Sequence, residues 1–229
     1  MTARDLVFAT LRRSLGVTGT EAPRRAAVAA RLAGHPRGVV PARGQLPPQQ
    51  RLDLFTRMLE AASGTTERVA SATDIPAAVV TFLRGHNLPH RVRRGGDPRL
   101  DLPWETAPAL EILRGPSDGH DLAAVSHAFT AVAETGTVVL ASGPDNPTTL
   151  NFLPDVHIVV VDASDIGADF ETVMARLRER YGTATMPRTV NMITGPSRSA
   201  DIEQTLLLGA HGPRKLHVIV VGNPEAAPY

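Results

Sequence analysis

The sequence contains no cysteine and almost no lysine. The absence of cysteine excludes disulfides, thiolate zinc sites and cysteine-ligated iron–sulfur clusters built by this chain, and it excludes a cysteine nucleophile. Lys215 is the only lysine, so a Schiff-base mechanism would have to use that residue.

Aromatic side chains are also scarce, at 4% of 229 residues, whereas hydrophobic residues reach 42%. The core must be built mainly from valine, leucine, isoleucine and alanine, and the length suits one α/β domain with a helical extension or two small domains. Few aromatics argue against a nucleic-acid partner, since single-strand binding relies on stacking. No apolar run reaches the length of a membrane span and no signal peptide opens the sequence, so we expect a cytoplasmic protein.

The formal net charge of +1 conceals an uneven distribution. Residues 1–51 hold nine arginines against only Asp5 and Glu21, a local balance of +7, so the rest of the chain carries −6. Such an N-terminus is compatible with a transit peptide, a nucleic-acid arm or a docking surface. A pair of solvated amphipathic helices is the simpler interpretation, and docking to a partner is the second.

The first part of the chain has the pattern of three helices. Apolar residues recur at helical spacing over residues 3–15 and 48–62, and an alanine-rich stretch covers residues 22–33. The proline- and glycine-rich segment 36–48 is expected to be a linker. We therefore predict an N-terminal helical extension over residues 1–46 and an α/β domain over residues 47–229.

Short apolar runs alternate with helical patterns in the remainder. Strands are predicted over residues 67–72, 88–92, 137–141, 157–161, 189–194 and 216–221, and helices over residues 73–83, 168–180 and 197–208. Residues 120–130 fit either a helix running into a strand or a strand alone. Strands that are apolar throughout indicate a largely parallel sheet flanked by helices, and ligands of such sheets bind at the carboxyl ends of strands. The predicted fold class is therefore α/β.

The segment Ala-Glu-Thr-Gly-Thr at residues 133–137 is the first that could carry chemistry. Thr135 and Gly136 precede a valine-rich strand and form a turn signal, which places Glu134 at a strand edge or in a tight loop. A carboxylate there could act as a nucleophile, a base or a metal ligand. On spacing alone, an acid that caps backbone amides is the simpler interpretation.

The segment Thr-Gly-Pro-Ser-Arg-Ser-Ala-Asp-Ile-Glu at residues 194–203 lies between a predicted strand and a predicted helix. Gly195 lets the backbone turn, Ser197 or Ser199 can cap the helix, and Asp201 falls in its first turn. A helix N-terminus beside the end of a strand is also an anion site, to which Arg198 could add a bidentate contact. A ligand site and an ordinary capped helix are equally good interpretations. The segment is neither a Walker loop nor a dinucleotide-binding fingerprint.

The histidines do not form a metal motif. His120, His127 and Glu134 are spaced by seven residues, which would align them on a helix, but the last part is expected to be a strand. No Gly-x-Ser-x-Gly elbow is present, which disfavours a serine hydrolase. His211 could be an acid–base group, although a histidine at a helix C-terminus is the simpler interpretation.

Two further histidines, His157 and His217, open or lie within apolar runs. Such positions are typical of structural residues in a strand. We therefore expect no metal ligands among them, and no cofactor is identified.

Four segments together resemble the LUD-domain family, in particular its lactate-utilization protein C type. They are Ala-Glu-Thr-Gly-Thr-Val-Val-Leu at 133–140, Leu-Pro-x-Val-His-Ile-Val-Val at 153–160, Gly-Pro-Ser-Arg-Ser-Ala-Asp-Ile-Glu at 195–203 and Leu-Gly-Ala-His-Gly-Pro-Arg at 208–214. The likeness covers residues 120–222 closely and the rest loosely. It implies a fold like that of ribose-5-phosphate isomerase, glucosamine-phosphate deaminase and the CoA-transferases.

The resemblance also implies a role in the oxidation of L-lactate to pyruvate, together with two partner proteins that carry iron–sulfur chemistry. The C-type member lacks cluster ligands, as this cysteine-free chain does. On this hypothesis the chain binds a small anionic ligand. The ligand would lie near Glu134, Thr135 and Gly136 and near Gly195, Ser197, Arg198, Ser199, Asp201 and His211.

Two positions depart from the family's pattern. Ala128-Phe129-Thr130 stands where family members often have an aspartate, and Thr148 stands where they often have an arginine. Two other hypotheses remain open beside the lactate role. One is a stand-alone CoA-transferase-like enzyme in which Glu134 attacks an acyl thioester, and the other is a non-catalytic docking or regulatory protein that uses the arginine-rich N-terminus.

Overall fold

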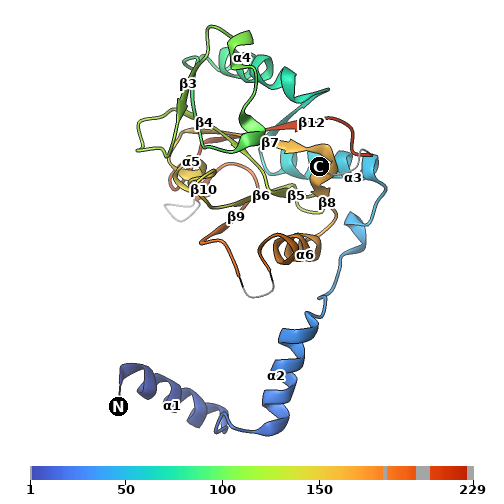
Figure 1. Ribbon diagram of the computed structural model, residues 1–229, viewed down its shortest axis with the longest axis vertical. Coiled ribbons are helices and arrows are strands. Elements are labelled where there is room, and N and C mark those ends of the chain that lie inside the picture. Colours follow the sequence, from blue (N-terminus) through green and yellow to red (C-terminus); the bar gives the residue numbers. More distant parts are fainter. Residues whose placement is uncertain (1, 183–184, 200–206, 226–229) are drawn as a thin grey trace. The chain divides into compact units, whose positions relative to one another are not determined.

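The structure, a computed structural model, describes residues 2–182, 185–199 and 207–225 and divides into two compact units, Met1–Val40 and Pro41–Tyr229. The first unit holds α1 (Ala3–Leu15) and α2 (Ala22–Gly34), close to the two helices predicted there (Figure 1). A capping box between Thr2 and Asp5 begins α1, and Gly16 ends it in a left-handed conformation. Within the described ranges, no helix is long and apolar enough to cross a membrane.

The second unit is built on a six-stranded sheet in the order β1-β12-β7-β4-β2-β3. The strands are β1 (Thr65–Val69), β2 (Arg91–Arg94), β3 (Glu111–Arg114), β4 (Ala123–His127), β7 (Val156–Asp162) and β12 (Lys215–Val221). All five neighbouring pairs are parallel. The central strands β4, β7 and β12 are buried almost throughout, which is why they are apolar on both faces. The α/β fold with a largely parallel sheet is confirmed.

Both faces of this sheet are covered. On one face, α4 (Ile75–Gly85) packs Val79 and Leu83 against strand residues such as Ile158 and Ile219. On the other face, α3 (Pro48–Ala61) packs with a second sheet against Val159 and Val218. Figure 1 shows α4 on one side of the labelled strands β7 and β12 and α6 on the other.

The second sheet is a departure from the sequence prediction. It has four strands in the order β8-β5-β6-β9, which are β8 (Ile166–Gly167), β5 (Thr130–Val132), β6 (Thr137–Ala141) and β9 (Val190–Ile193). The strands predicted over 137–141 and 189–194 therefore exist, but they pair antiparallel and lie outside the parallel sheet. β6 also pairs antiparallel with β5, because the four-residue turn 133–136 that joins them is too short for the crossover that parallel pairing needs. The outer face of this sheet packs on α6 (Phe170–Tyr181).

The helix predicted over residues 197–208 is wrong at both of its described ends. Residues Arg198–Ser199 form β10, which pairs antiparallel with β11 (Leu207–Leu208). The backbone N–H of Ser197 donates to Pro213 O at 2.8 Å, and that of Gly209 donates to Ser197 O at 3.0 Å. These backbone partners replace the helical ones that the capping residues favoured, so tertiary pairing outweighs local propensity. Residues 200–206, with Asp201, lie outside the described part.

Smaller differences concern boundaries and short elements. The strand predicted over 67–72 is β1, which ends at Val69, and the helix predicted from residue 73 follows the short turn η2 (Ala72–Asp74). The strand predicted over 88–92 is shifted to β2, and β3 had no prediction. The ambiguous segment 120–130 contains β4 and the start of β5, two strands in different sheets. The remaining short elements are η1 (Ala42–Gly44), η3 (Pro98–Leu100), η4 (Trp104–Thr106), α5 (Thr149–Phe152) and η5 (Ala163–Asp165).

Candidate functional site

A cavity of about 280 Å³ is lined by α5, by β9, by residues near the starts of β7 and β12, and by the segments that follow β9 and precede β12. Four of the residues predicted as ligand-binding line it, namely Gly195, Ser197, Arg198 and His211. The volume is slightly below the usual range of ligand pockets, about 300–1,000 Å³, and therefore fits a small molecule. The structure thus brings together the two C-terminal segments singled out in the sequence, without the helix that was expected to join them.

Ser197 holds these two segments together. Its hydroxyl oxygen accepts a hydrogen bond from the backbone N–H of His211 at 3.3 Å, in addition to the two backbone bonds of Ser197. The Arg198 guanidinium donates to the carbonyl of Ala62 at the end of α3, at 3.0 Å. A guanidinium has five donors, so this contact leaves Arg198 able to bind an anion at the cavity. Ser199 lies in β10 and does not line the cavity.

The Glu-Thr-Gly-Thr segment forms the turn between β5 and β6, so Glu134 does lie in a tight loop. A chain of hydroxyl contacts joins this turn to the cavity: Thr135 Oγ1 lies 2.7 Å from Thr137 Oγ1, which lies 2.5 Å from Thr194 Oγ1. Thr194 lines the cavity, but Thr135 and Gly136 do not. This segment therefore supports Thr194 through hydroxyl contacts and does not itself line the cavity.

Glu134 itself is buried, with 4% of its surface exposed, and lines neither this cavity nor the two described below. Its Oε2 has no hydrogen-bond partner among the described residues. A nucleophile has to be reached by its substrate. The geometry therefore gives no support to the hypothesis of a CoA-transferase-like Glu134.

Three buried polar side chains, two of which line the cavity, are joined by hydrogen bonds. Ser126 in β4 donates to Asn151 Oδ1 at 3.4 Å, and its oxygen lies 3.0 Å from His157 Nε2. A serine hydroxyl has one proton, so Ser126 must accept from His157, which places the imidazole proton on Nε2. His157 Nδ1 is then a bare acceptor, and Asn151 Nδ2 a donor, and neither has a partner within the described ranges.

His157 is held in its neutral form. Complete burial lowers the pKa of His157 to about 3. The unpartnered Nδ1 therefore remains a hydrogen-bond acceptor across the physiological pH range. Asn151 and His157 both line the cavity, and each carries one buried atom without a partner among the described residues, a donor in Asn151 and an acceptor in His157.

Sequence reasoning missed Asn151 and assigned His157 a structural role only. Nothing near Asn151 in the sequence marks it, because α5 is a single four-residue turn with no periodic pattern. His157 carried a usable signal: a polar residue inside an otherwise apolar strand must find a partner when it is buried. Within the described ranges, no three or more histidine, aspartate or glutamate side chains come together in a group that could hold a metal ion.

The stretch that builds the cavity is also one that a family model matches. Residues 122–221 match the LUD domain. This match confirms the family resemblance recognised from the sequence. Every residue that lines the cavity, from Asn151 to Leu216, lies inside the stretch that matches the LUD domain.

Curated relatives are similar over a stretch of comparable length. The protein named lactate utilization protein C from Geobacillus thermodenitrificans is 41% identical over 107 residues, 45% of this chain and 45% of the relative. Its namesake from Bacillus subtilis is 40% identical over 93 residues, 40% of this chain and 39% of the relative. The chain thus covers less than half the length of these relatives.

One solved structure is similar over a larger share of the chain. The crystal structure of a DUF162 family protein from Deinococcus radiodurans superposes with a TM-score of 0.54 at 26% identity, over 77% of this chain and 99% of that one. The likeness therefore extends beyond the stretch that matches the LUD domain into the preceding part of the α/β unit.

Proposed function

We propose that this chain serves lactate utilization by holding a small 2-hydroxy acid, L-lactate in the first place, in the LUD-domain cavity. The names of the relatives from Geobacillus and Bacillus support the role in lactate utilization. The choice of ligand rests on the pair of unpartnered buried atoms, Asn151 Nδ2 and His157 Nδ1. Leaving both unpaired costs about 1–3 kcal/mol each, which a suitable ligand would recover.

A 2-hydroxy acid matches this pair in chemistry. Its carboxylate accepts from Asn151 Nδ2, and its hydroxyl donates to His157 Nδ1. Arg198 and the Ser197 hydroxyl lie on the same cavity and supply further donors for the carboxylate.

The neutral His157 suits binding rather than proton abstraction. Its pKa of about 3 makes it a weak base, far from the value that a general base needs near neutral pH. Oxidation of lactate to pyruvate also releases two electrons, for which this cysteine-free chain has no cluster ligands. In this proposal the chain holds the ligand and acts with iron–sulfur partner proteins that accept the electrons.

Binding of lactate analogues tests the ligand. Calorimetric titration of the purified chain is expected to show binding of L-lactate. Propionate, which lacks the hydroxyl, is expected to bind at least about tenfold more weakly. His157→Leu removes the acceptor, so it is expected to weaken L-lactate to the level of propionate while leaving propionate unchanged. His217→Leu, at another buried strand histidine that does not line the cavity, is the matched control. Equal affinity for L-lactate and propionate in the unmodified chain would contradict the proposal.

Growth tests the physiological role. Deleting the gene in its own organism is expected to abolish growth on L-lactate as sole carbon source but not on pyruvate. The full-length gene should restore growth, and the His157→Leu gene should restore less. Normal growth on L-lactate after deletion would rule out the role.

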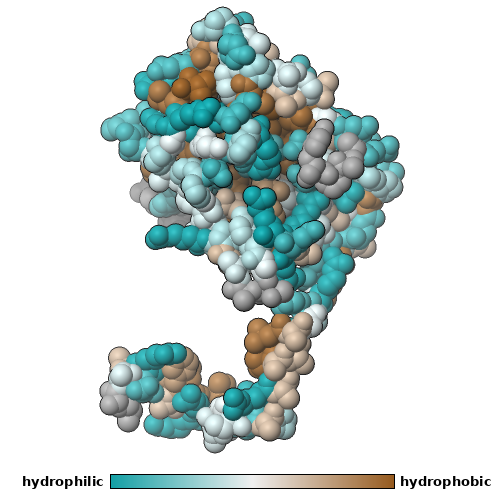
Figure 2. Space-filling model, in the orientation of Figure 1, coloured by the Kyte–Doolittle hydropathy of each residue, from teal (hydrophilic) through white to brown (hydrophobic). Residues whose placement is uncertain are grey.

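A docking function is a second candidate, supported by the first unit. Neither α1 nor α2 has a buried residue, and both expose large hydrophobic side chains among their arginines (Figure 2). These exposed side chains are Leu6, Val7, Phe8, Leu11, Leu15, Val28 and Leu32. Apolar and cationic residues together suit an acidic partner surface, with affinity that falls as salt rises.

Truncation tests this docking role. Removing residues 1–34 is expected to reduce co-purification with the iron–sulfur partners, and added salt should weaken the full-length complex. The α/β unit should still bind L-lactate. Unchanged complex formation by the truncated chain would exclude the docking role.

A further inference from the structure

A second polar site lies at the carboxyl ends of the parallel strands, away from the cavity described above. Two hollows, of about 300 and 480 Å³, share Arg99 and His127 as lining residues. The larger hollow is also lined by the last residues of β7 and β12, Asp162 and Val221. This edge is where sheets of this type generally bind their ligands.

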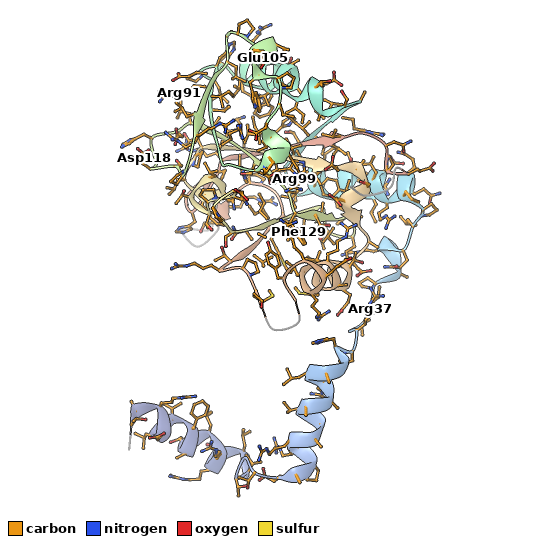
Figure 3. All side chains as sticks on the ribbon, viewed as in Figure 1. Arg37, Arg91, Arg99, Glu105, Asp118 and Phe129 are labelled. Carbon is orange, nitrogen blue, oxygen red and sulfur yellow. The ribbon has the colours of Figure 1, made fainter. Side chains whose placement is uncertain are left out.

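The smaller hollow is lined by two arginines. Arg99 comes from η3 and Arg180 from the last turn of α6. Arg99 and Phe129, which also lines the hollow, are labelled in Figure 3. The Arg180 guanidinium lies 6.0 Å from the centre of the Phe129 ring, so the aromatic face helps to fix its position.

Arg99 is held in place but not saturated. Its Nε and Nη2 donate to the two oxygens of Asp97 at 3.0 and 2.7 Å, and its Nη1 donates to Ala128 O at 3.1 Å. These bonds use three of five N–H groups, so one on each terminal nitrogen has no partner among the described residues. The side chain is 43% exposed. A pre-oriented guanidinium with two spare donors is suited to an oxyanion.

His127 lines both hollows together with Arg99 and is itself buried. Its Nδ1 lies 3.0 Å from Ala128 O, and its Nε2 lies 3.4 Å from Asp162 Oδ2. Both ring nitrogens therefore face acceptors, an arrangement that only the protonated imidazole satisfies fully. Burial and the charge of Arg99 oppose that protonation, and they lower the pKa of His127 below its ordinary value.

Other charges surround the pair. Burial disfavours ionisation of Asp97, but the hydrogen bonds and charge of Arg99 keep the pKa of Asp97 below its ordinary value. On the β7 side, burial raises the pKa of Asp165, against the charge of Arg176. The remaining titratable groups that line the smaller hollow are Asp145, Arg180 and Tyr181.

We propose that the smaller hollow binds a small oxyanion, a carboxylate or a phosphate, between Arg99 and Arg180, and that binding is coupled to protonation of His127. The anion offsets the positive charge of Arg99, which opposes protonation of His127. Protonated His127 then donates to both Ala128 O and Asp162. The coupling is reciprocal, so the anion binds more tightly as pH falls, by up to about tenfold per pH unit between the pKa values of the free and bound states.

Histidine NMR tests the coupling. Isotope-labelled protein, with the His127 signal assigned from a His127→Gln sample, is titrated with acid in chloride, acetate or inorganic phosphate at constant ionic strength. Acetate or phosphate is expected to raise the midpoint of the His127 titration relative to chloride. The anion that gives the larger shift identifies the chemistry of the ligand.

Three arginine variants complete the test. Arg99→Gln and Arg180→Gln are each expected to remove or reduce the anion-dependent shift, and Arg178→Gln, on the same helix as Arg180 but outside the lining, should retain it. Arg180 is exposed, so its variant reports on the site even if the Arg99 variant does not fold. The same His127 titration in all three salts, or a shift that survives in both Arg99→Gln and Arg180→Gln, would overturn the proposal.

Discussion

Replacing Gly195 with alanine is expected to lower the free energy of unfolding by about 3 kcal/mol or more. Gly195 has φ of +78°, and a Cβ there would lie 2.1 Å from the carbonyl oxygen of Ala62 at the end of α3. The left-handed conformation alone costs an L-residue about 1–2 kcal/mol. The overlap adds the cost of moving either the end of α3 or the cavity segment, because the atoms that a Cβ would meet belong to the backbone and the Cβ of Ala62 and not to a flexible side chain.

Gly222→Ala is the matched control. Gly222 has the same φ of +78°, but a Cβ there would meet nothing within 4 Å. Its replacement is expected to cost only the conformational part, about 1–2 kcal/mol. Urea unfolding of both variants measures the difference. An equal loss in the two would mean that the approach of Gly195 to α3 contributes nothing.

A second glycine in the segments singled out from the sequence also lies against α3. Gly136, in the turn that holds Glu134, also has a positive φ, and a Cβ there would lie 2.2 Å from the backbone nitrogen of Leu59 in α3. Both glycines therefore let loops approach the last turns of one helix. Their position in the sequence suggested ligand contact, and the structure places both glycines against backbone atoms of α3 or of the residue that ends it.

What the sequence predicts well is governed by local pattern. The buried strands β6 and β7 were placed to within a residue, since continuous runs of valine have few alternatives. What it misses depends on partners far away in the chain. Arg198–Ser199 pairs with Leu207–Leu208 instead of beginning a helix, and β6 pairs with β5 and β9 instead of joining the parallel sheet.

The residues of the candidate site also fall into those with a local sequence signal and those whose role depends on distant partners. The sequence identified Ser197 and His211 because turn and cap chemistry leaves a local signature. It gave no indication of Asn151, and it left His157 as a structural residue, because the unpaired state of their buried atoms exists only once α5, β4 and β7 are packed together. The sequence also gave no indication of the smaller hollow at Arg99 and Arg180, because its residues come together only in the folded chain.

Lowering the pH from 7.5 to 5.5 is expected to reduce the free energy of unfolding by about 3 kcal/mol through two buried histidines. Burial lowers the pKa of His157 to about 3, and burial together with His86 lowers the pKa of His217 to about 4. In the unfolded chain both titrate near 6.5. Between about pH 6.5 and the folded values the unfolded state binds more protons, so their contribution is complete above about pH 6.5 and is lost as pH falls.

His157→Leu is expected to remove about half of this pH dependence, and His217→Leu the other half, whatever each variant does to stability at pH 7.5. Urea unfolding at a series of pH values measures the slopes. His120→Gln, at an exposed position, should keep the full dependence, and carboxyl groups that titrate in the same window are common to all samples. If His157→Leu keeps the slope of the unmodified chain, His157 is not held neutral. Its Nδ1 would then not be the acceptor that the lactate proposal requires, so one measurement tests both the core and the site.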